Sequence, residues 1–555
     1  MSSPFTTPAE GKSSESTEAW GSAGYVDTAV SADTTSSISG GYVDTVSSGS
    51  GGALPSAGYV DTTIGSPASF SGSSLSAGGG DGSLPGEILA TKEEEDRLRG
   101  FFAQEGELGS LDVAVRDKHA LLLNVYAEPG KFQVAALTAQ EAVIPEVLAG
   151  PKADRKQGES AIVSEAEFMG RWQEFTNGSL ASIDWNNVFV AGGAVLKCLL
   201  RDSPTDDRKS ESKGSDIDLF LYGLSDEAAN AKVRDIYDRI FPGSSKKEMV
   251  RTKNAITMIF GFPTRHVQVI LRMYRSPAEV LMGFDIDSCT VGYDGANVWA
   301  LPRAHRAITR GYNLVDLSRR SLTYELRLHK YSKRGFAVRI PGYRPQEVDV
   351  NLYQDTRAVK DVTGLARLLL LEHRAGATAA ARSKGFREDP FSHDRALEQA
   401  LAADPGTSAH DEDYIMIFIP WGPRWSIQST FRLLNMRDMS QYFANLAKDP
   451  HFHSHICLTG SAAAFDGRAS WCKSCMAGRT PATAEGKDFV GGPITWLRKN
   501  PGSQGKGVLD GLLTGSFHPL SADDWTRDAY RDYGGQRGVQ PAPYVSSAMK
   551  KGPRT

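Results

Sequence analysis

The chain has 555 residues, of which 40% are hydrophobic and 23% charged, and its formal net charge is −4. This length allows two to four domains with at least one large core, and so small a net charge gives no overall case for nucleic-acid binding. The five cysteines, an odd number, argue against a disulfide framework and for a reducing compartment. The N-terminus lacks the pattern of a signal peptide, and no run of about 18 apolar residues occurs. We therefore expect an intracellular protein, cytoplasmic or nuclear, with no membrane partner.

Residues 1–86 are rich in Ser, Gly, Thr and Ala, and this composition predicts a disordered tail because it buries too little apolar surface to offset the entropy of ordering. The pentapeptide Gly-Tyr-Val-Asp-Thr occurs three times, with tyrosines at Tyr25, Tyr42 and Tyr59, each 17 residues apart. Such a repeat predicts docking or phosphorylation sites for an SH2-type or other peptide-binding partner. Tandem duplication without a selected function is the alternative.

The rest of the chain is predicted to divide into five parts. They are a helical N-terminal extension over 87–159, an α/β to α+β core over 160–345, a helical charged segment over 346–412, a C-terminal α+β module over 413–535 and a basic tail over 536–555. In the extension, helices are expected over 88–106 and 139–148. The core is expected to open with a helix that Ser164 caps. It should bury an aromatic face, because Phe168, Trp172 and Phe175 are spaced four and three apart.

The core alternates strands and helices and should form a mixed sheet. Its predicted elements are a strand over 187–191, a helix over 194–200, a strand over 216–221, a helix over 226–241, and strands over 255–260, 266–274, 284–291 and 298–301.

Two short motifs in this core carry the chemistry. Gly192 and Gly193 end a strand and open a helix, which lets the backbone approach a phosphate and offers it unpaired N–H groups. Asp216 and Asp218 lie two apart on a strand, so both carboxylates project from one face. Two like charges in a partly buried place favour a cation between them, and Mg²⁺ with oxygen ligands is the usual solution. One or two such ions clamp phosphates and activate an acceptor hydroxyl for in-line attack.

Together these motifs resemble the signature of the DNA polymerase β-like nucleotidyltransferase superfamily, over residues 160–340. The resemblance implies that Gly192, Gly193 and Ser215 contact the phosphates of a nucleoside triphosphate substrate. It also implies that Asp216 and Asp218 bind Mg²⁺ or Mn²⁺. The same stretch looks like eukaryotic proteins sometimes labelled ankyrin-repeat proteins, although the sequence contains no ankyrin repeat.

Active members of that superfamily place a third carboxylate on a later strand. In this sequence that position falls near Gln268, and glutamine is a poor base. Asp285 and Asp287 share a face of the next predicted strand and are the expected substitutes as catalytic acids. The sequence therefore predicts a Mg²⁺-dependent transfer of a nucleotidyl group from an NTP to an acceptor hydroxyl on RNA, protein or a small molecule. The alternative is a catalytically inactive scaffold with a tyrosine-motif docking tail.

Two further segments each have two possible interpretations. Residues 318–334 predict a basic helix, which either lines a groove for phosphates or RNA or presents a solvated charged face. His451, His453, His455 and Cys457 precede Cys472 and Cys475, an arrangement that either holds a structural Zn²⁺ ion or serves a redox or purely structural role.

Overall fold

The computed structural model describes ten stretches of the chain, with residues 253, 322, 424 and 495 left out of them. These stretches are 84–103, 117–149, 155–201, 216–241, 248–354, 362–383, 419–434, 456–459, 494–498 and 524–530. All of them belong to one unit, residues 78–555. The three tyrosine repeats, Ser215 and the side chains of the predicted His/Cys group lie outside the described residues. None of the helices in the described part combines the length and the apolar character needed to span a bilayer.

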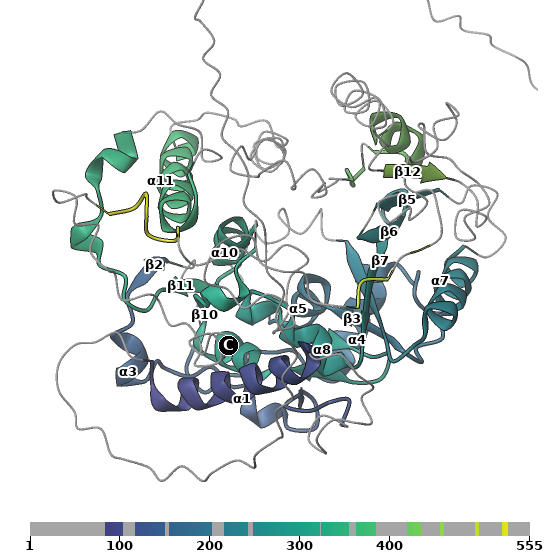
Figure 1. Cartoon of the computed structure of the whole chain (residues 1–555), viewed down its shortest axis with the longest axis horizontal. Coiled ribbons are helices and arrows are strands. Elements are labelled where there is room, and N and C mark those ends of the chain that lie inside the picture. Colours follow the sequence, from purple (N-terminus) through teal and green to yellow (C-terminus); the bar gives the residue numbers. More distant parts are fainter. Residues whose placement is uncertain are drawn as a thin grey trace, which may run out of the picture. The chain divides into compact units, whose positions relative to one another are not determined.

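The centre of the fold is a nine-stranded mixed sheet with the strand order β1-β9-β8-β3-β4-β7-β6-β5-β12 (Figure 1). In that order the strands are Leu123–Asn124, Val298–Ala300, Val291–Tyr293, Val188–Ala191, Ile217–Tyr222, Val267–Tyr274, Ala255–Met258, Met249–Thr252 and Ile456–Thr459. Strands β4 and β7 run parallel, and the other neighbours described in this sheet run antiparallel. The predicted mixed α/β architecture is confirmed.

Helices cover this sheet, and a smaller sheet lies beside them. The α-helices are α1 Gly86–Ala103, α3 Ala139–Ala142, α4 Glu165–Thr176, α5 Gly193–Leu199, α7 Asp226–Ile240, α8 Pro277–Met282, α9 Pro302–Arg310, α10 Tyr324–Ser332 and α11 Gly364–Ser383. The 3-10 helices are η2 Pro129–Lys131, η4 Asp287–Cys289, η5 Leu317–Arg319, η6 Pro345–Glu347 and η7 Val350–Gln354. The small sheet has the order β10-β11-β2, with strands Tyr312–Leu314, Ala337–Arg339 and Glu146–Leu148.

Alternation along β4 assigns the two faces of the large sheet. Ile217, Leu219 and Leu221 are fully buried in the main core, which also contains apolar side chains of α4, α5 and α7. Phe220 and Tyr222 point the other way, into a second cluster formed with α1 and α8. Those two helices contact each other on that face (Figure 1). Because side chains of a strand alternate, Asp218 lies on the face of α1 and α8.

Helix α4 begins where its capping signal predicts. The Ser164 side chain accepts a hydrogen bond from the backbone N–H of Glu167, which satisfies one of the free donors of the first turn. Phe168, Trp172 and Phe175 are all buried in the main core, so the predicted aromatic face is confirmed. This packing fixes α4 against α5 and β8 and so supports the end of β3.

Two predicted elements are wrong. The expected helix over 139–148 stops at Ala142, because Pro145 cannot continue a helix and Glu146–Leu148 then pair with β11. The expected strand over 284–291 is mainly a loop and the 3-10 helix η4, and strand pairing begins only at Val291. Strand β5, Met249–Thr252, was not predicted from the sequence.

Candidate active site

Gly192 and Gly193 lie where β3 passes into α5. Gly192 has φ +89°, a left-handed conformation that side chains disfavour, and a Cβ atom there would come 3.0 Å from the Phe284 ring. Glycine is therefore required at this turn on conformational and steric grounds. Helix α5 has only seven residues, so its dipole is short and a bound anion here needs further positive charge.

Replacing Gly193 by alanine is expected to disturb the contact between this turn and α10. The new Cβ would lie 2.8 Å from the Tyr331 hydroxyl oxygen and 3.4 Å from Nη1 of Arg334. We expect a loss of about 1–3 kcal/mol in the free energy of unfolding, the usual cost of overpacking. Gly170→Ala is the matched control, since Gly170 lies in α4 with open space around its Cβ position. Equal thermal unfolding midpoints for the two variants would contradict the close contact.

Asp216 and Asp218 stand beside that turn. The register of β3 and β4 pairs Val190 with Leu219, so its next step places Ala191 across from Asp218 and brings Asp216 toward the two glycines. Both aspartates are partly buried. Among the described residues, neither carboxylate takes part in a hydrogen bond or an ion pair, which leaves their oxygens available to a ligand.

The electrostatics of this pair favour a bound cation. Burial, the largest effect, and the nearby Asp218 carboxylate raise the pKa of Asp216 to about 8 against the opposing charges of Lys330 and Arg265. Burial likewise raises the pKa of Asp218 to about 7. The Lys330 ammonium lowers both pKa values but does not offset the burial. A divalent cation would supply the positive charge that these two carboxylates lack.

Helix α10 brings cationic side chains to the same place. The spacing of Lys330 and Arg334 puts them on one face of the chain that runs through α10 and its C-terminal turn. The positive charge of Lys330 attracts both carboxylates. The guanidinium of Arg334 lies next to Gly193, where a Cβ atom would come 3.4 Å from its Nη1. The pKa of Lys330 is lowered, chiefly by burial of its ammonium group and second by repulsion from Arg334. The side chain as a whole is nevertheless exposed. The predicted basic helix over 318–334 is confirmed only for α10, because residues 317–319 form the 3-10 helix η5 and the α-helix begins at Tyr324. One side of α10 lines this site.

Gln268 occupies the place beside Asp218 on the next strand. The parallel register of β4 and β7 pairs these two residues, so they lie about 4.8 Å apart across the ladder, the usual strand spacing. The Gln268 amide donates a hydrogen bond of 2.9 Å to the Thr257 hydroxyl. A neutral amide at this position supplies no third negative charge.

Asp285 and Asp287 do not join the pair but belong to other ion pairs. Asp285 is buried and contacts Arg327 of α10 at 2.6 Å. Asp287 is buried between Arg303 and Arg306 of α9, at 3.4 and 2.6 Å, and also accepts a hydrogen bond of 3.0 Å from the backbone N–H of Leu314. The predicted common strand face of the two aspartates is wrong, because η4 replaces that strand. Their role as catalytic acids stays a prediction without geometric support.

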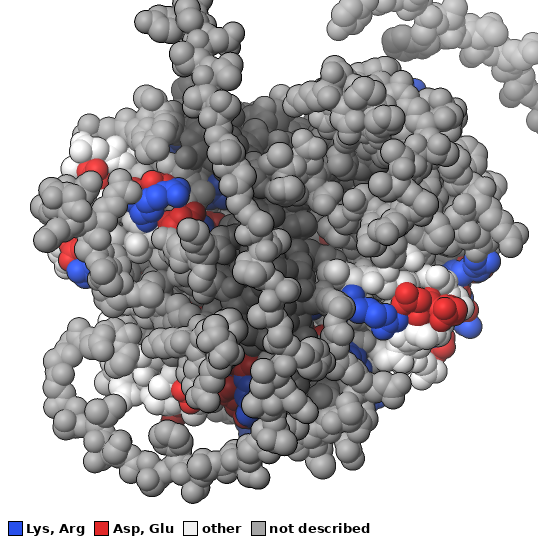
Figure 2. All heavy atoms as spheres, in the orientation of Figure 1, with Lys and Arg blue, Asp and Glu red and all other residues white. Residues whose placement is uncertain are grey.

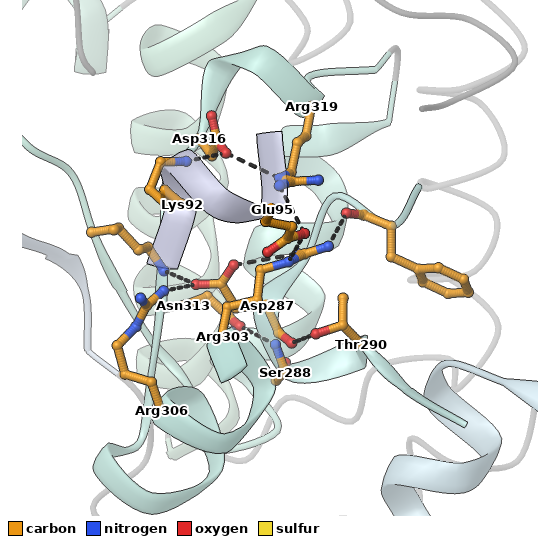
Figure 3. Close-up of polar contacts among 12 residues, drawn as sticks. Lys92, Glu95, Asp287, Ser288, Thr290, Arg303, Arg306, Asn313, Asp316 and Arg319 are labelled. Carbon is orange, nitrogen blue, oxygen red and sulfur yellow. Dashed lines mark hydrogen bonds and ion pairs between the residues drawn. The ribbon is translucent and has the colours of Figure 1, made fainter. Parts of the chain in front are cut away.

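Asp287 is part of a larger buried ionic cluster that joins α1 to the core (Figure 3). The members of this cluster drawn with charged side chains are Lys92, Glu95, Asp287, Arg303, Arg306, Asp316 and Arg319. Burial opposes the ionisation of Glu95, but the guanidiniums of Arg303 and Arg319 outweigh it and hold the pKa of Glu95 low. We therefore assign Asp287 to this structural cluster.

The residues that could hold a metal ion are thus Asp216, which directly precedes β4, and Asp218 within it. In the described part of the chain, no group of three or more His, Cys, Asp or Glu side chains lies close enough to share one ion. Two carboxylates nevertheless fit Mg²⁺, because that ion keeps several waters and takes its other oxygen ligands from the phosphates of a substrate.

Three comparisons place this region among known proteins. We call the glycine turn, the two aspartates and the cations Lys330 and Arg334 the β3–β4 site. Residues 165–310, which hold α4 to α9 with the glycine turn and the two aspartates but not the two cations, match a family described as Gabija anti-defense 2 family protein. A protein of Acanthamoeba polyphaga mimivirus, "Uncharacterized protein R883", is 35% identical over 178 residues, which are 29% of this chain and 38% of that protein. The crystal structure of the Bacillus stearothermophilus CCA-adding enzyme in complex with CTP matches at 16% identity, covering 43% of this chain and 52% of that chain. Its TM-score of 0.21 is too low to establish a shared fold. The chain thus spans about two fifths of the mimivirus relative and half of the CCA-adding enzyme.

Proposed function

We propose that this protein binds a nucleoside triphosphate with Mg²⁺ at the β3–β4 site and transfers its nucleotidyl group to an acceptor hydroxyl. The observation that carries the proposal is the meeting of Asp216 and Asp218 with the cations of α10 at a glycine turn. Asp216 and Asp218 would hold the Mg²⁺ ion, which would supply positive charge to stabilise the developing charge of the phosphates. Lys330 and Arg334 contact the phosphates that leave.

The reaction balances without a further reactant. The acceptor oxygen forms a bond to the α-phosphorus, and the bond from that phosphorus to the bridging oxygen breaks, so pyrophosphate leaves. The proton of the acceptor hydroxyl passes to solvent. Gln268, which stands beside Asp218, cannot take that proton, and this predicts slow turnover in comparison with a site that has a third carboxylate.

Calorimetric titration of the four NTPs in the presence of Mg²⁺ tests the site. We expect binding to the wild type and its loss in Asp216→Ala/Asp218→Ala. Asp235→Ala/Asp238→Ala is the matched control, because it removes two acidic side chains from the exposed side of α7 and changes the net charge equally. Failure of the wild type to bind any NTP, or undiminished binding by the double variant at the site, would overturn the proposal.

A second candidate is a catalytically inactive scaffold that binds nucleotide without turnover. The neutral Gln268 beside Asp218 and the pairing of Asp285 and Asp287 with arginines favour it. The two candidates separate in a transfer assay with labelled NTP and an excess of candidate acceptors. Label that becomes attached to an acceptor only with intact Asp216 and Asp218 supports the enzyme. Binding without any transfer supports the scaffold.

The family match suggests a biological setting for the same region. We propose that residues 165–310 serve an anti-defence role, and that this role depends on the β3–β4 site. Phage infection of cells that carry the Gabija system, with and without expression of this chain, tests it. Protection of the phage by the wild type and not by Asp216→Ala/Asp218→Ala is the expected result. Equal protection by both would separate the anti-defence role from the site.

A further inference from the structure

A short segment late in the chain lies in a groove built by other parts of the fold. Residues 524–530 run beside α11 (Figure 1). The Leu365 N–H donates a hydrogen bond of 2.8 Å to the Trp525 carbonyl, and the Asp349 N–H donates one of 3.0 Å to the Ala529 carbonyl. These backbone contacts fix the path of the segment. We call the parts of η6, η7, α10 and α11 that contact it the groove.

Trp525 is the anchor of the 524–530 segment. Its side chain is 1% exposed and lies in the main core, where its ring centroid is 6.4 Å from that of Tyr324 and 5.4 Å from the Arg320 guanidinium. Gly364 leaves room for its backbone, because a Cβ atom there would come 2.8 Å from the Trp525 Cα. A tryptophan buried in this way is the type of residue that supplies most of the binding free energy of a complex.

Polar contacts hold the two ends of the segment. Asp524 pairs with the buried Arg320 guanidinium and accepts a hydrogen bond of 2.8 Å from the Thr363 hydroxyl. At the other end, the Tyr530 hydroxyl accepts a hydrogen bond of 3.1 Å from the Arg344 N–H. An acidic residue, a tryptophan and a tyrosine therefore each meet a contact of their own, which is how a groove selects a peptide sequence.

The charges around the groove are mixed in sign. Figure 2 shows acidic and basic side chains next to each other at the upper left of the view, where Figure 1 places α11. The segment also carries both signs, with Asp524 and Asp528 on either side of Arg527. Attraction between surfaces of opposite sign therefore contributes little to docking, and burial of Trp525 contributes most.

The groove is continuous with the helix that supplies the cations of the candidate active site. Tyr324, which contacts Trp525, is the first residue of α10, and Lys330 lies further along the same helix. The Thr323 side chain makes no capping hydrogen bond at the start of α10. The first turn depends instead on the Tyr324 hydroxyl, which accepts a hydrogen bond of 2.9 Å from the Asp316 N–H, and on packing against Trp525. An empty groove would leave a cavity at this end of α10.

We propose that the groove is a peptide-recognition site for the 524–530 segment, and that its occupancy holds α10 where Lys330 and Arg334 face the β3–β4 site. Recognition of the segment is independent of catalysis, whereas the effect on nucleotide binding rests on the proposed function. The segment is tethered to its groove and so acts at a high effective concentration. A free peptide of the same sequence therefore competes poorly until the anchors of the tethered copy are removed.

Fluorescence anisotropy of a labelled peptide of residues 521–532 with the full chain tests the recognition. Asp524→Ala/Trp525→Ala/Tyr530→Ala, which vacates the groove without changing it, should bind the peptide at least about tenfold more tightly than the wild type. The same peptide carrying Trp525→Ala should not bind. Adding Gly364→Ala to the triple variant should abolish binding. Gly158→Ala is the matched control, because Gly158 has the same left-handed backbone, φ +83°, and open space around its Cβ position.

Hydrogen exchange and calorimetry measure the coupling to α10. In the triple variant the amides of Tyr324–Ser332 should exchange faster while those of β4 keep their protection, and NTP affinity should fall about tenfold, a usual size for coupling between two sites. Added peptide should reverse both changes. If the triple variant does not fold, Gly364→Ala alone is expected to give the same local loss of protection, because its Cβ displaces Trp525.

Two results would overturn the proposal: failure of the triple variant to bind the peptide, or protection of α10 that does not change when the groove is vacant. Neither measurement contains NTP or Mg²⁺. Peptide that restores the protection of α10 while no form of the protein binds NTP would support the groove and reject the nucleotide site. The two proposals therefore fail separately.

Discussion

Replacement of Asp287 by alanine is expected to lower the free energy of unfolding by about 3–5 kcal/mol, because it leaves the buried Arg306 guanidinium without the carboxylate that it pairs with. Asp287 is 3% exposed and faces the guanidiniums of Arg303 and Arg306, which are themselves buried. Its carboxylate also accepts the Leu314 N–H. Three donors would lose their acceptor at once. Thermal unfolding should show a midpoint lower by about 10 °C.

Asp285→Ala is the matched control, because it also removes a buried aspartate that pairs with an arginine. Asp285 is also buried, but its partner Arg327 keeps 40% of its side chain exposed and can return to solvent. Burial already raises the pKa of Asp285, so removal of this carboxyl should cost little. Similar losses in the two variants would contradict the structural assignment of Asp287. An Asp287→Ala protein that unfolds normally and binds NTP but loses transfer would instead restore Asp287 as a catalytic acid.

The parts of this site that follow local rules could be predicted from the sequence. A buried apolar strand that ends in Gly192-Gly193 forms β3 and the turn into α5, and the alternation around Asp216 and Asp218 forms the start of β4. Each depends on residues adjacent in the chain, whose side-chain periodicity fixes the element. The same is true of the Ser164 cap of α4.

The placement of Asp285 and Asp287 could not be predicted in this way. The alternation of Phe284, Asp285, Ile286 and Asp287 matches a strand with one polar face, and it predicts two carboxylates on a common face that complete the site. The position of Asp287 is instead determined by arginines of α9, which form buried ion pairs with it. One of these arginines also pairs with Glu95 of α1. Such long-range ion pairs leave no local signal in the sequence.

The cationic side of the site could be predicted only in part. Basic residues at helical spacing were sufficient to predict α10, but not to decide between a solvated face and a phosphate-binding face. Tertiary packing decides, because Tyr331 is buried against the glycine turn and turns Lys330 toward the two aspartates. The contact of Phe262 with Trp421 likewise could not be predicted, because residues 419–434 lie far along the chain from the β6–β7 turn that they pack beside.

Binding of Mg²⁺ at the β3–β4 site is expected to strengthen steeply as the pH rises through 7 to 8. The pKa of Asp216 is raised to about 8 and that of Asp218 to about 7, so both carboxyls hold protons in the ligand-free protein at lower pH. A metal ion must displace these protons, which costs up to about tenfold in affinity per proton and pH unit. Calorimetry at about pH 6 and about pH 9, in buffers of different ionisation enthalpy, should show proton release that disappears at the higher pH.

The same shifts predict the sign of a stability effect. The unfolded carboxyls have a pKa near 4, so between roughly pH 4 and 8 the folded, metal-free protein binds more protons than the unfolded chain and loses stability as the pH rises. Asp216→Asn removes part of this loss, and its metal-free midpoint should exceed that of the wild type at high pH while no longer rising with Mg²⁺. Asp235→Asn, at an exposed ion pair of α7, is expected to keep the wild-type response.

A wild-type affinity for Mg²⁺ that is the same at both pH values would show that the two carboxylates are already ionised, and would remove the electrostatic reason for placing the ion between them.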